Sequence, residues 1–396
     1  MLNREIFFQY LAQTSDSPPA LELAGSEGCY LIDRHGKRYL DLISGIAVSS
    51  LGHGNPAIRE SIHRQVDQFL HLMVYGEHVL SPQVALVHEL IQLLPPSLQC
   101  VYLTNSGSEA TEGAMKIAKR LTGRTNFISF KNSYHGSTQG ALSICGNEML
   151  KRSYRPLLPG NTILDYYDVD QLVQIDERVA AVFIEPIQGE AGVRVGDGNF
   201  LNLLRKRCTD MGALLVFDEI QTGMGRTGTM FAWESMQVVP DMLLLGKALG
   251  GGMPLGAMVS SKEIMSVISH DPHLGHLTTT GGHPVSCAAA LASLRQLRDG
   301  RLAEAAKEKE KLFRELLHHE LIREIRGRGL LLAVDFGEEE INRNIIENCM
   351  HQGVLSDWFL FSADCMRIAP PLIVSKEEIR FCCEVILRAA DEFTRG

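Results

Sequence analysis

The sequence predicts an α/β layer fold built around a central sheet of seven strands, with a smaller α/β domain beside it. Short apolar runs recur through the middle of the chain, each followed by a Gly, Asn or Pro break and a longer stretch of helical spacing. Runs such as VAAVFIE, ALLVFDE and DMLLLGK are apolar on both alternating faces, as expected of strands that helices cover on both sides. With 396 residues, 45% of them hydrophobic, the chain is long enough for two or three domains of about 100–200 residues each.

The middle of the chain holds the seven expected strands and the helices between them. A helix is expected directly after Ser106, where Glu109 completes a capping box. The apolar residues of this helix share one stripe: Ala110, Ala114, Ile117, Ala118 and Leu121. We expect the strands near residues 100–104, 126–130, 161–164, 179–185, 213–218, 241–245 and 256–260.

The two ends of the chain have a different pattern. Near the N-terminus, CYLID and KRYLDLI flank Arg34-His35-Gly36 and predict a β-hairpin. After Gly282 come two charged helices, the second over residues 303–322, and then an alternating strand, GLLLAVDF. We therefore predict a large domain over residues 50–282 and a small domain formed by residues 1–49 together with 283–396.

Charge and cysteine content exclude several classes of protein. The chain has 38 Lys and Arg against 47 Asp and Glu, a formal charge of −9, and nucleic acid or an anionic membrane does not attract a net anion. Its nine cysteines include no C-x-x-C pair, so we expect reduced thiols of a cytoplasmic protein. The first residues, MLNREIFFQYLAQ, lack the apolar core of a secretory signal, and no window approaches ~18 consecutive apolar residues.

Three patterns suggest sites that their context does not support. GMGRTG at 223–228 fits the dinucleotide fingerprint G-x-G-x-x-G, but it does not form the turn between a strand and a helix. The GK pair at 246–247 lacks the first Gly and the Ser or Thr of a phosphate-binding P-loop. The histidines of HDPHLGH at 270–276 stand in a loop without a carboxylate or thiolate cluster, so we expect no metal there.

Two charged residues stand at the ends of successive predicted strands, where ligands of open α/β sheets bind. Lys247 follows an apolar run, and loss of hydration there lowers the pKa of its amine and makes it a Schiff-base nucleophile. A lysine that reaches water or pairs with a carboxylate is the alternative. Asp218 ends the run ALLVFD, where a buried carboxylate needs a partner such as a protonated heteroaromatic nitrogen or an arginine.

The segment TNSGSEATEGAMK has the strand, turn and helix of an anion site. The N–H groups of Gly107 and Ser108 and the positive end of the helix dipole suit a phosphate, although they would also serve ordinary helix capping. A phosphate cradle, an aromatic ring at Tyr134, a buried aspartate and a buried lysine are together what pyridoxal 5′-phosphate requires of a protein.

On these residues the chain resembles the class III (subgroup II) aminotransferases of the fold-type I pyridoxal-phosphate enzymes, which include acetylornithine, ornithine and 4-aminobutyrate aminotransferases. The resemblance runs from YLIDRHGKRYLDLISGIAVSSLGHGNP through NSGSEA, YHG, EPIQGEAG, DEIQTGMGRTG and GKALGGGMPLGA to MRIAPPL. It implies a mostly parallel seven-stranded sheet, a small domain from both chain ends, and a homodimer whose active sites lie at the subunit interface.

The resemblance also assigns roles to individual residues. It implies that Lys247 binds the cofactor covalently and that Asp218 pairs with the pyridine nitrogen. Arg367 would hold a substrate carboxylate by two parallel hydrogen bonds, and Glu190 would pair with Arg367 when the donor has no carboxylate there. The other implied cofactor contacts are Ser106, Gly107 and Ser108 at the phosphate, Tyr134 stacked on the ring with His135 next to it in sequence, Gln221 near the phenolic oxygen, Glu185 in a supporting role, and Thr279 reaching the phosphate of the neighbouring subunit.

Four positions depart from the family pattern and leave the donor open. Ser137 stands where many members have an arginine for the donor's distal carboxylate. Ile46 takes a place held by tyrosine in ornithine aminotransferases. The usual GGNP reads GGHP here, with His283, and Thr280 replaces the aromatic residue before it.

The expected reaction is transfer of an amino group to 2-oxoglutarate by a ping-pong mechanism, from the omega-amino group of a donor such as N-acetylornithine or 4-aminobutyrate. Three alternatives stay open. They are another reaction of the same cofactor, such as an aminomutase or a decarboxylating transaminase; a catalytically silent homologue with a binding role; and a nicotinamide oxidoreductase built on GMGRTG.

Overall fold

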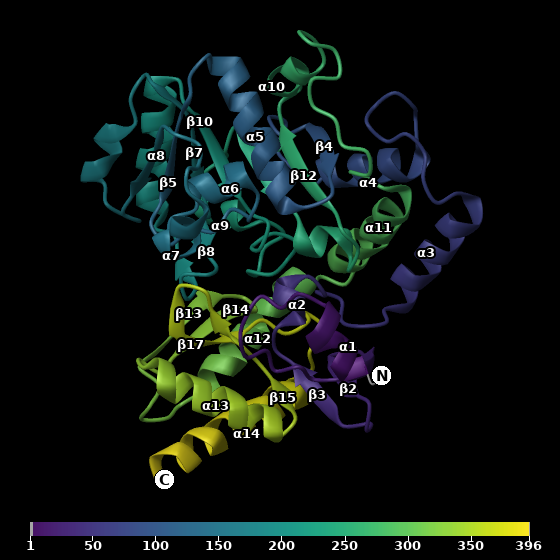
Figure 1. The fold of residues 1–396 in the computed structure, drawn as a ribbon, viewed down its shortest axis with the longest axis vertical. Coiled ribbons are helices and arrows are strands. Elements are labelled where there is room, and N and C mark those ends of the chain that lie inside the picture. Colours follow the sequence, from purple (N-terminus) through teal and green to yellow (C-terminus); the bar gives the residue numbers. More distant parts are fainter. Residues whose placement is uncertain (1–2, 396) are drawn as a thin grey trace.

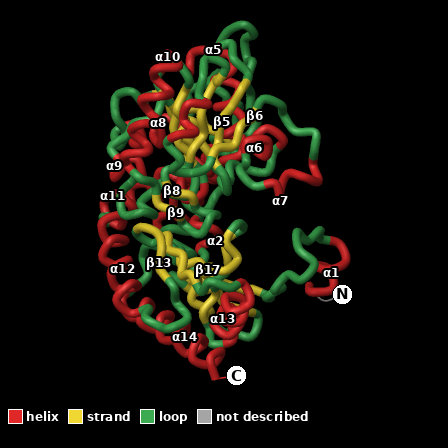
Figure 2. The backbone as a smooth tube through the Cα atoms, turned by 90° about the vertical axis from the view of Figure 1, so that its left-hand side faces the viewer, coloured by secondary structure: helices red, strands yellow, loops and turns green. Residues whose placement is uncertain are grey.

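The structure, a computed structural model, describes residues 3–395 and consists of two lobes (Figure 1). The large lobe, residues 56–299, surrounds a seven-stranded sheet, and the small lobe, residues 23–41 and 302–395, contains two four-stranded sheets. Helix α1 (Asn3–Tyr10) has no buried residue and lies at the end of a segment that extends away from both lobes (Figure 2). The predicted α/β fold is therefore confirmed.

The central sheet of the large lobe has the strand order β4-β12-β11-β10-β7-β5-β6. Strand β12 runs antiparallel to β4 and β11, and the other neighbours pair in parallel. All seven predicted strands are present, with ends that differ by at most one residue from those expected. They are β4 (Cys100–Thr104), β5 (Asn126–Phe130), β6 (Asn161–Leu164), β7 (Val179–Ile184), β10 (Leu214–Asp218), β11 (Met242–Leu245) and β12 (Gly256–Ser260).

The strands at the centre of the sheet are buried because helices cover both faces (Figure 1). Every residue of β7, β10, β11 and β12 is buried, as the continuous apolar runs predicted. The helices of the large lobe are α3 (Pro56–Gln68), α4 (Ser81–Ile91), α5 (Gly107–Thr122), α6 (Gln139–Ile144), α7 (Glu148–Lys151), α8 (Gly198–Met211), α9 (Ala232–Met236), α10 (Lys262–Met265) and α11 (Pro284–Asp299), with short 3-10 turns η1 (Arg152–Tyr154), η2 (Asp170–Gln174), η3 (Lys247–Gly250) and η4 (Ser266–Ile268).

Helix α5 confirms most of its predicted features and corrects two of them. Ser106 caps the helix, since its Oγ accepts the Glu109 N–H at 3.3 Å. The second half of the capping box is wrong: the Glu109 carboxylate accepts from the N–H and the side-chain amide of Asn105, which lies one residue earlier than expected. Leu121, in the last turn, is 39% exposed, so the buried stripe ends at Ala118.

The small lobe confirms the predicted hairpin. Strands β2 (Tyr30–Asp33) and β3 (Arg38–Asp41) pair antiparallel, and Gly36 adopts a φ of 83°, which favours glycine. The two sheets run β1-β2-β3-β15 and β13-β14-β17-β16. Their other elements are β1 (Leu23–Glu27), β13 (Glu324–Arg328), β14 (Leu331–Asp335), β15 (Val354–Leu355), β16 (Trp358–Phe359) and β17 (Ser362–Ile368), and the helices are α12 (Leu302–Leu316), α13 (Glu339–His351) and α14 (Lys376–Arg395).

The two helices expected after Gly282 differ from their prediction. Helix α12 ends at Leu316 rather than near residue 322, because buried Leu317 turns the chain inward and His319 bonds to Asp391 of α14. Helix α11 is mostly buried rather than charged, and it packs against α3 and α4. The domain boundary after residue 282 stays a prediction, and this packing favours a boundary nearer residue 300.

A buried arginine joins the two lobes. Arg226, inside GMGRTG, is fully buried, and its Nη1 donates to the carbonyls of Leu330 at 3.0 Å and Pro370 at 2.5 Å. Its Nη2 donates to Ser50 Oγ at 3.2 Å. Burial lowers the pKa of Arg226 to about 9. The glycines of this motif therefore shape a turn around a structural arginine, and no helix begins there as a dinucleotide site requires.

Neither a disulfide nor a membrane-spanning helix is found within residues 3–395. All nine cysteines are free, and Cys100 is the single one that is not fully buried. From residue 3 to 395 no helix combines the length and apolar character needed to cross a membrane.

Candidate functional site

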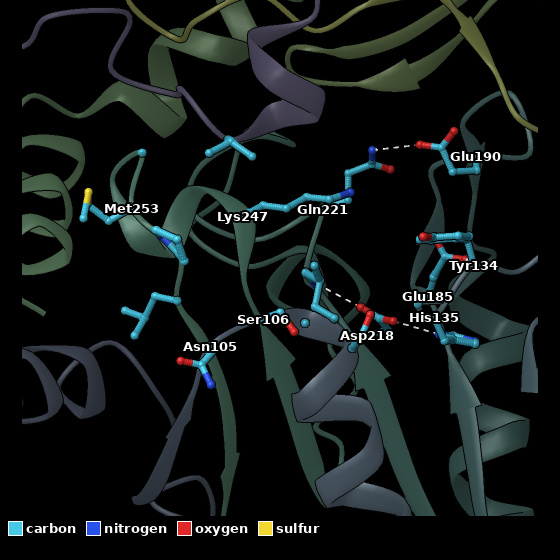
Figure 3. A pocket seen from close by; sticks show the side chains of 18 residues that line it. Asn105, Ser106, Tyr134, His135, Glu185, Glu190, Asp218, Gln221, Lys247 and Met253 are labelled. Carbon is cyan, nitrogen blue, oxygen red and sulfur yellow. Dashed lines mark hydrogen bonds and ion pairs between the residues drawn. The ribbon is translucent and has the colours of Figure 1, made fainter. Parts of the chain in front are cut away.

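A cavity of about 430 Å³ opens at the carboxyl ends of the central strands (Figure 3). It lies where β4, β10 and β11 end, as ligand sites do in open α/β sheets. The structure brings ten of the predicted site residues together in its wall: Ser106, Gly107, Ser108, Tyr134, His135, Glu185, Glu190, Asp218, Gln221 and Lys247. The lining residues that sequence reasoning missed are Val48, Asn105, Gly136, Ile220, Gly252, Met253, Pro254 and Leu255.

Lys247 follows β11 after one glycine and projects into this cavity (Figure 3). Its φ is 46°, in the left-handed region that side chains rarely adopt, and such strain is typical of functional positions. No hydrogen bond or ion pair within residues 3–395 holds its Nζ. Burial lowers the pKa of the Lys247 amine, and the nearby Glu190 partly opposes this effect. The side chain is thus a free amine with raised nucleophilic character.

Asp218 is the last residue of β10 and is 4% exposed. Its Oδ2 accepts from His135 Nδ1 at 2.7 Å, and its Oδ1 accepts the Ile220 N–H at 3.1 Å. His135 Nε2 is buried without a partner. Each carboxylate oxygen still has a lone pair for a further donor, so Asp218 can accept a proton-bearing nitrogen from the cavity.

The start of α5 forms the predicted anion cradle. Gly107 and Ser108 are the first helical residues, and such N–H groups have no carbonyl partner within their helix. A Cβ added to Gly107 would lie 2.6 Å from Ile220 Cδ1, so glycine is required for this close approach. The helix dipole adds partial positive charge at the same point.

Tyr134 and Glu185 form the wall opposite Lys247 (Figure 3). The Glu185 carboxylate accepts the N–H groups of Tyr134 at 2.9 Å and Gly189 at 3.0 Å. Burial raises the pKa of Glu185 to about 7, although the nearby His135 opposes the rise. Glu185 therefore orients the two loops that carry Tyr134 and Glu190.

Arg367 lies behind Glu190, outside the cavity wall. Its Nη1 and Nη2 donate to the two oxygens of Glu190 at 3.2 and 3.1 Å, and Gln221 Nε2 donates to the same carboxylate at 3.1 Å. Arg367 is 2% exposed. Burial alone would raise the pKa of Glu190, but Arg367 holds it below its ordinary value. We call Arg367 and Glu190 the gate, since Glu190 lines the cavity and Arg367 lies behind it.

Sequence reasoning missed a second acidic partner of Arg367. Asp357 Oδ1 accepts from Arg367 Nε at 2.6 Å. The only sequence signal was an acidic residue inside the otherwise mostly apolar stretch VLSDWFLF. The contact depends on the pairing of short β16 with β17, which local patterns did not indicate.

Besides Arg367, three predicted residues lie outside the cavity wall. Ile46 sits in α2 (Ser44–Ala47), a left-handed turn two residues before the lining residue Val48. Ser137 Oγ lies 3.0 Å from Tyr134 Oη and is exposed. Thr279 is exposed on this chain. Their contacts with substrate or a second subunit stay predictions.

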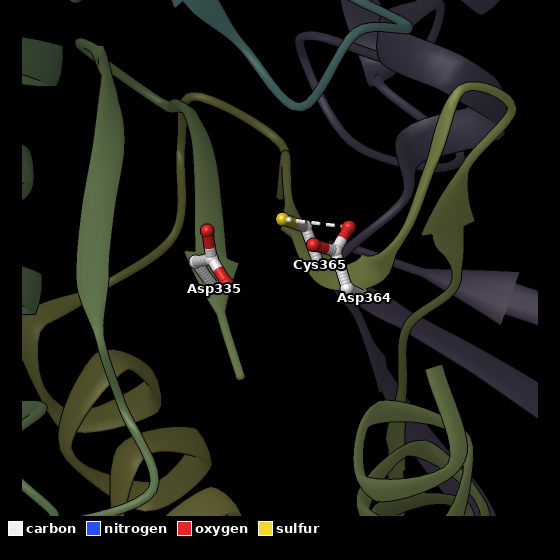
Figure 4. A group of neighbouring side chains, drawn as sticks. All are labelled: Asp335, Asp364 and Cys365. Carbon is white, nitrogen blue, oxygen red and sulfur yellow. Dashed lines mark hydrogen bonds between the residues drawn. The ribbon is translucent and has the colours of Figure 1, made fainter. Parts of the chain in front are cut away.

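One cluster outside the cavity has side chains of the kinds that bind metal ions, but a neighbouring arginine already balances their negative charge. Asp335, Asp364 and Cys365 offer ligand atoms within 4.8 Å of one another (Figure 4). Arg326, however, donates to Asp335 Oδ2 at 2.6 Å and to Cys365 Sγ at 3.0 Å. An arginine thus already supplies the cation that these groups need.

Comparisons with known proteins agree with this geometry. The model of the class III aminotransferase family matches residues 10–390. An acetylornithine aminotransferase of Methanopyrus kandleri is 38% identical over 381 residues, which are 95% of each chain. An ornithine aminotransferase of Toxoplasma gondii, with partial occupancy of PLP at its active site, is 30% identical with a TM-score of 0.91 over 99% of this chain and 95% of that one. The omega transaminase of Pseudomonas jessenii in complex with PMP is 25% identical, with a TM-score of 0.92 over 100% and 99% of the two chains.

The cavity fits the cofactor that these relatives contain. The α5 terminus suits its phosphate, Asp218 has room for its ring nitrogen, and Lys247 is an unpartnered amine for its aldehyde. The volume of about 430 Å³ lies within the range of about 300–1,000 Å³ found for small-molecule sites. The chain therefore belongs to the class III aminotransferases, and its cofactor is pyridoxal phosphate.

Proposed function

We propose that the enzyme takes the omega-amino group of donors such as N-acetylornithine or 4-aminobutyrate and passes it to 2-oxoglutarate by a ping-pong mechanism. The observation that carries this proposal is the two-bonded ion pair between Arg367 and Glu190. While the pair is closed, the cavity wall presents a carboxylate rather than an arginine. A donor whose reacting carbon bears no carboxylate fits this state.

The second half-reaction needs the opposite state of the gate. When Glu190 turns away, Arg367 can bind the carboxylate beside the keto group of the acceptor through Nη1 and Nη2. One side-chain movement thus lets the same cavity accept an amine donor and a 2-oxo acid in turn.

The other residues of the cavity divide the proton chemistry. When bound, pyridoxal phosphate supplies an electron sink for the carbon that carries the amino group. Asp218, backed by His135, would hold the proton on the pyridine nitrogen. Lys247 would hold the cofactor through its amine and, when that amine is free, its Nζ would accept the proton that the substrate carbon loses. The lowered pKa of Lys247 enlarges the neutral fraction of its amine, which is the form that can accept a proton.

We also propose that two chains share each site in a cytoplasmic homodimer. Thr279 is exposed on its own chain, as a residue that serves a neighbouring site must be. Nine free thiols are compatible with a reducing compartment.

A donor screen tests the proposal. The purified holoenzyme is incubated with N-acetylornithine, 4-aminobutyrate, ornithine, lysine and simple amines, with 2-oxoglutarate or pyruvate as acceptor. We expect an omega-amino donor and 2-oxoglutarate to give the highest kcat/KM, with parallel lines in double-reciprocal plots. Preference for α-amino donors would contradict the gate assignment. Carbon dioxide release or an internally rearranged product would favour the decarboxylating or aminomutase alternative.

A further inference from the structure

The gate arginine is held by two carboxylates rather than one. Glu190 binds its outer edge through Nη1 and Nη2, and Asp357 binds its inner edge through Nε at 2.6 Å. The Trp358 carbonyl accepts from Nη2 at 3.2 Å, and the guanidinium lies 4.2 Å from the centre of the Phe359 ring. With β16 on one side and Glu190 on the other, Arg367 has contacts at every edge.

The charges of these three residues do not balance. With the gate closed and both carboxylates ionised, Arg367, Glu190 and Asp357 together carry a net charge of −1. When Glu190 turns away, the pair of Arg367 and Asp357 that remains is neutral. The Arg367 guanidinium can therefore still donate hydrogen bonds to an acceptor carboxylate, but the charge of Asp357 already offsets its positive charge. Two unit charges about 5 Å apart interact appreciably even at an effective permittivity of about 20, so the affinity for carboxylates falls.

The contacts of Asp357 separate this electrostatic effect from a purely structural one. The backbone around it is already fixed, because the Arg367 N–H donates to the Asp357 carbonyl at 2.9 Å and Ser356 Oγ donates to the Arg367 carbonyl at 2.6 Å. The Asp357 side chain adds one hydrogen bond and one negative charge to that framework. An asparagine can keep the hydrogen bond through its Oδ1 and removes only the charge.

We propose that Asp357 is a specificity-determining residue, which keeps Arg367 in place and weakens the attraction of the open gate for carboxylates, so that the site favours omega-amines over α-amino acids. This inference rests on the proposed use of Arg367 as the carboxylate site. In the proposed scheme Asp357 is the second carboxylate, after Glu190, that affects how Arg367 binds a substrate. Because Asp357 contacts the arginine and not the substrate, it is a positioning residue.

The test measures binding of glutarate, a dicarboxylate without an amino or keto group, to the holoenzyme by calorimetry. Asp357→Asn should bind glutarate about tenfold more tightly than the wild type, as expected for removal of one nearby negative charge. Its KM for 2-oxoglutarate should fall by a similar factor, while kcat changes little. Asp357→Glu keeps the charge and should retain the wild-type affinity.

Asp210→Asn is the matched control. Asp210 lies in α8 and pairs with Lys206 at 2.6 Å, so this variant loses the same charge in an exposed ion pair. It should leave glutarate binding unchanged.

Unchanged or weaker glutarate binding in Asp357→Asn would overturn the proposal. An equal gain in glutarate affinity in Asp357→Glu and Asp357→Asn would also overturn it, because it would indicate a loosened loop rather than a lost charge. Since glutarate binding needs no donor, a tighter Asp357→Asn variant with no omega-amine activity would leave this inference standing and refute the proposed function instead.

Discussion

The two ends of the cavity are built in different ways. At the cofactor end, Gly107, Asp218 and Lys247 lie at or just beyond the carboxyl ends of three strands of one sheet. At the gate, Glu190 comes from a loop of the large lobe, whereas Arg367 lies in β17 of the small lobe. Its second partner, Asp357, directly precedes β16. The first end depends on the topology of one sheet. The second exists only when the two lobes are docked.

On the proposed function, the cofactor end determines the rate of the reaction and the gate determines which substrates bind. The cofactor end has one unpartnered amine and one carboxylate backed by a histidine, and neither needs to move before the cofactor binds. At the gate, Arg367 is paired with two carboxylates, and in the proposed mechanism it must leave Glu190 before it can bind a substrate. Changes at the first end should therefore affect kcat, and changes at the second should affect the choice of substrate.

The largest effect is expected from Lys247→Ala. The variant should lose turnover and the near-visible absorbance of the covalently held cofactor, because the described cavity lining offers no second amine in its place. Activity assays and absorption spectra of the purified protein check this. Lys262→Ala, an exposed lysine in α10, is the control and should match the wild type. A yellow or active Lys247→Ala protein would remove Lys247 from its role.

Asp218→Asn should lower kcat by at least about 100-fold, since an amide cannot stabilise a protonated pyridine nitrogen as a carboxylate does. Substrate KM should change far less. Asp241→Asn is the comparison at the opposite, amino end of β11, where Asp241 pairs with Arg205 at 2.7 Å. It should reduce stability without reducing kcat in the folded enzyme. If Asp218→Asn kept the kcat of Asp241→Asn, Asp218 would have no part in the chemistry of the cofactor end.

Glu190→Gln should change selectivity more than rate. The neutral side chain holds Arg367 less firmly, so the preference for omega-amines over α-amino acids should fall by about tenfold or more. The ratio of kcat/KM values for 4-aminobutyrate and glutamate as donors measures this effect. If kcat fell instead with an unchanged ratio, Glu190 would belong to the cofactor end.

The pKa of Lys247 links the two ends. The rate at which the apoenzyme binds pyridoxal phosphate covalently should rise with pH up to a pKa below the ordinary lysine value of 10.5 and then level off, because the neutral amine reacts. The Glu190 charge raises the pKa of Lys247. Glu190→Gln should therefore shift this profile to lower pH and speed binding near pH 7. A shift to higher pH would show that the two ends are not electrostatically coupled in this way.

The smallest effect is expected from Ser106→Ala. Loss of its cap on α5 should lower the free energy of unfolding by about 1 kcal/mol and weaken cofactor binding. Asn55→Ala removes a similar cap from α3, where Asn55 Oδ1 accepts the Ala57 N–H at 3.0 Å. It should cost a similar amount without changing cofactor affinity. Chemical denaturation and cofactor titration of both variants give the comparison.

The same contrast explains what could be predicted from the sequence. The buried central strands, and the places of Asp218 and Lys247 at their ends, follow from apolar runs in the local sequence, so these positions can be predicted from it. Asp357 could not be found in this way, because its partner lies across a short strand pair. The end of α12 was misplaced for a similar reason, since Leu317 and His319 leave the helix to contact other parts of the fold.

The arginine that joins the two lobes affects how the protein denatures. If the lobes separated while each stayed folded, Arg226 would lose its hydrogen bonds to the carbonyls of Leu330 and Pro370. A hydrogen bond to a charged group contributes about 1.5–3 kcal/mol, so a species with separated lobes is disfavoured. Heating should therefore melt both lobes in one cooperative transition, with equal calorimetric and van't Hoff enthalpies.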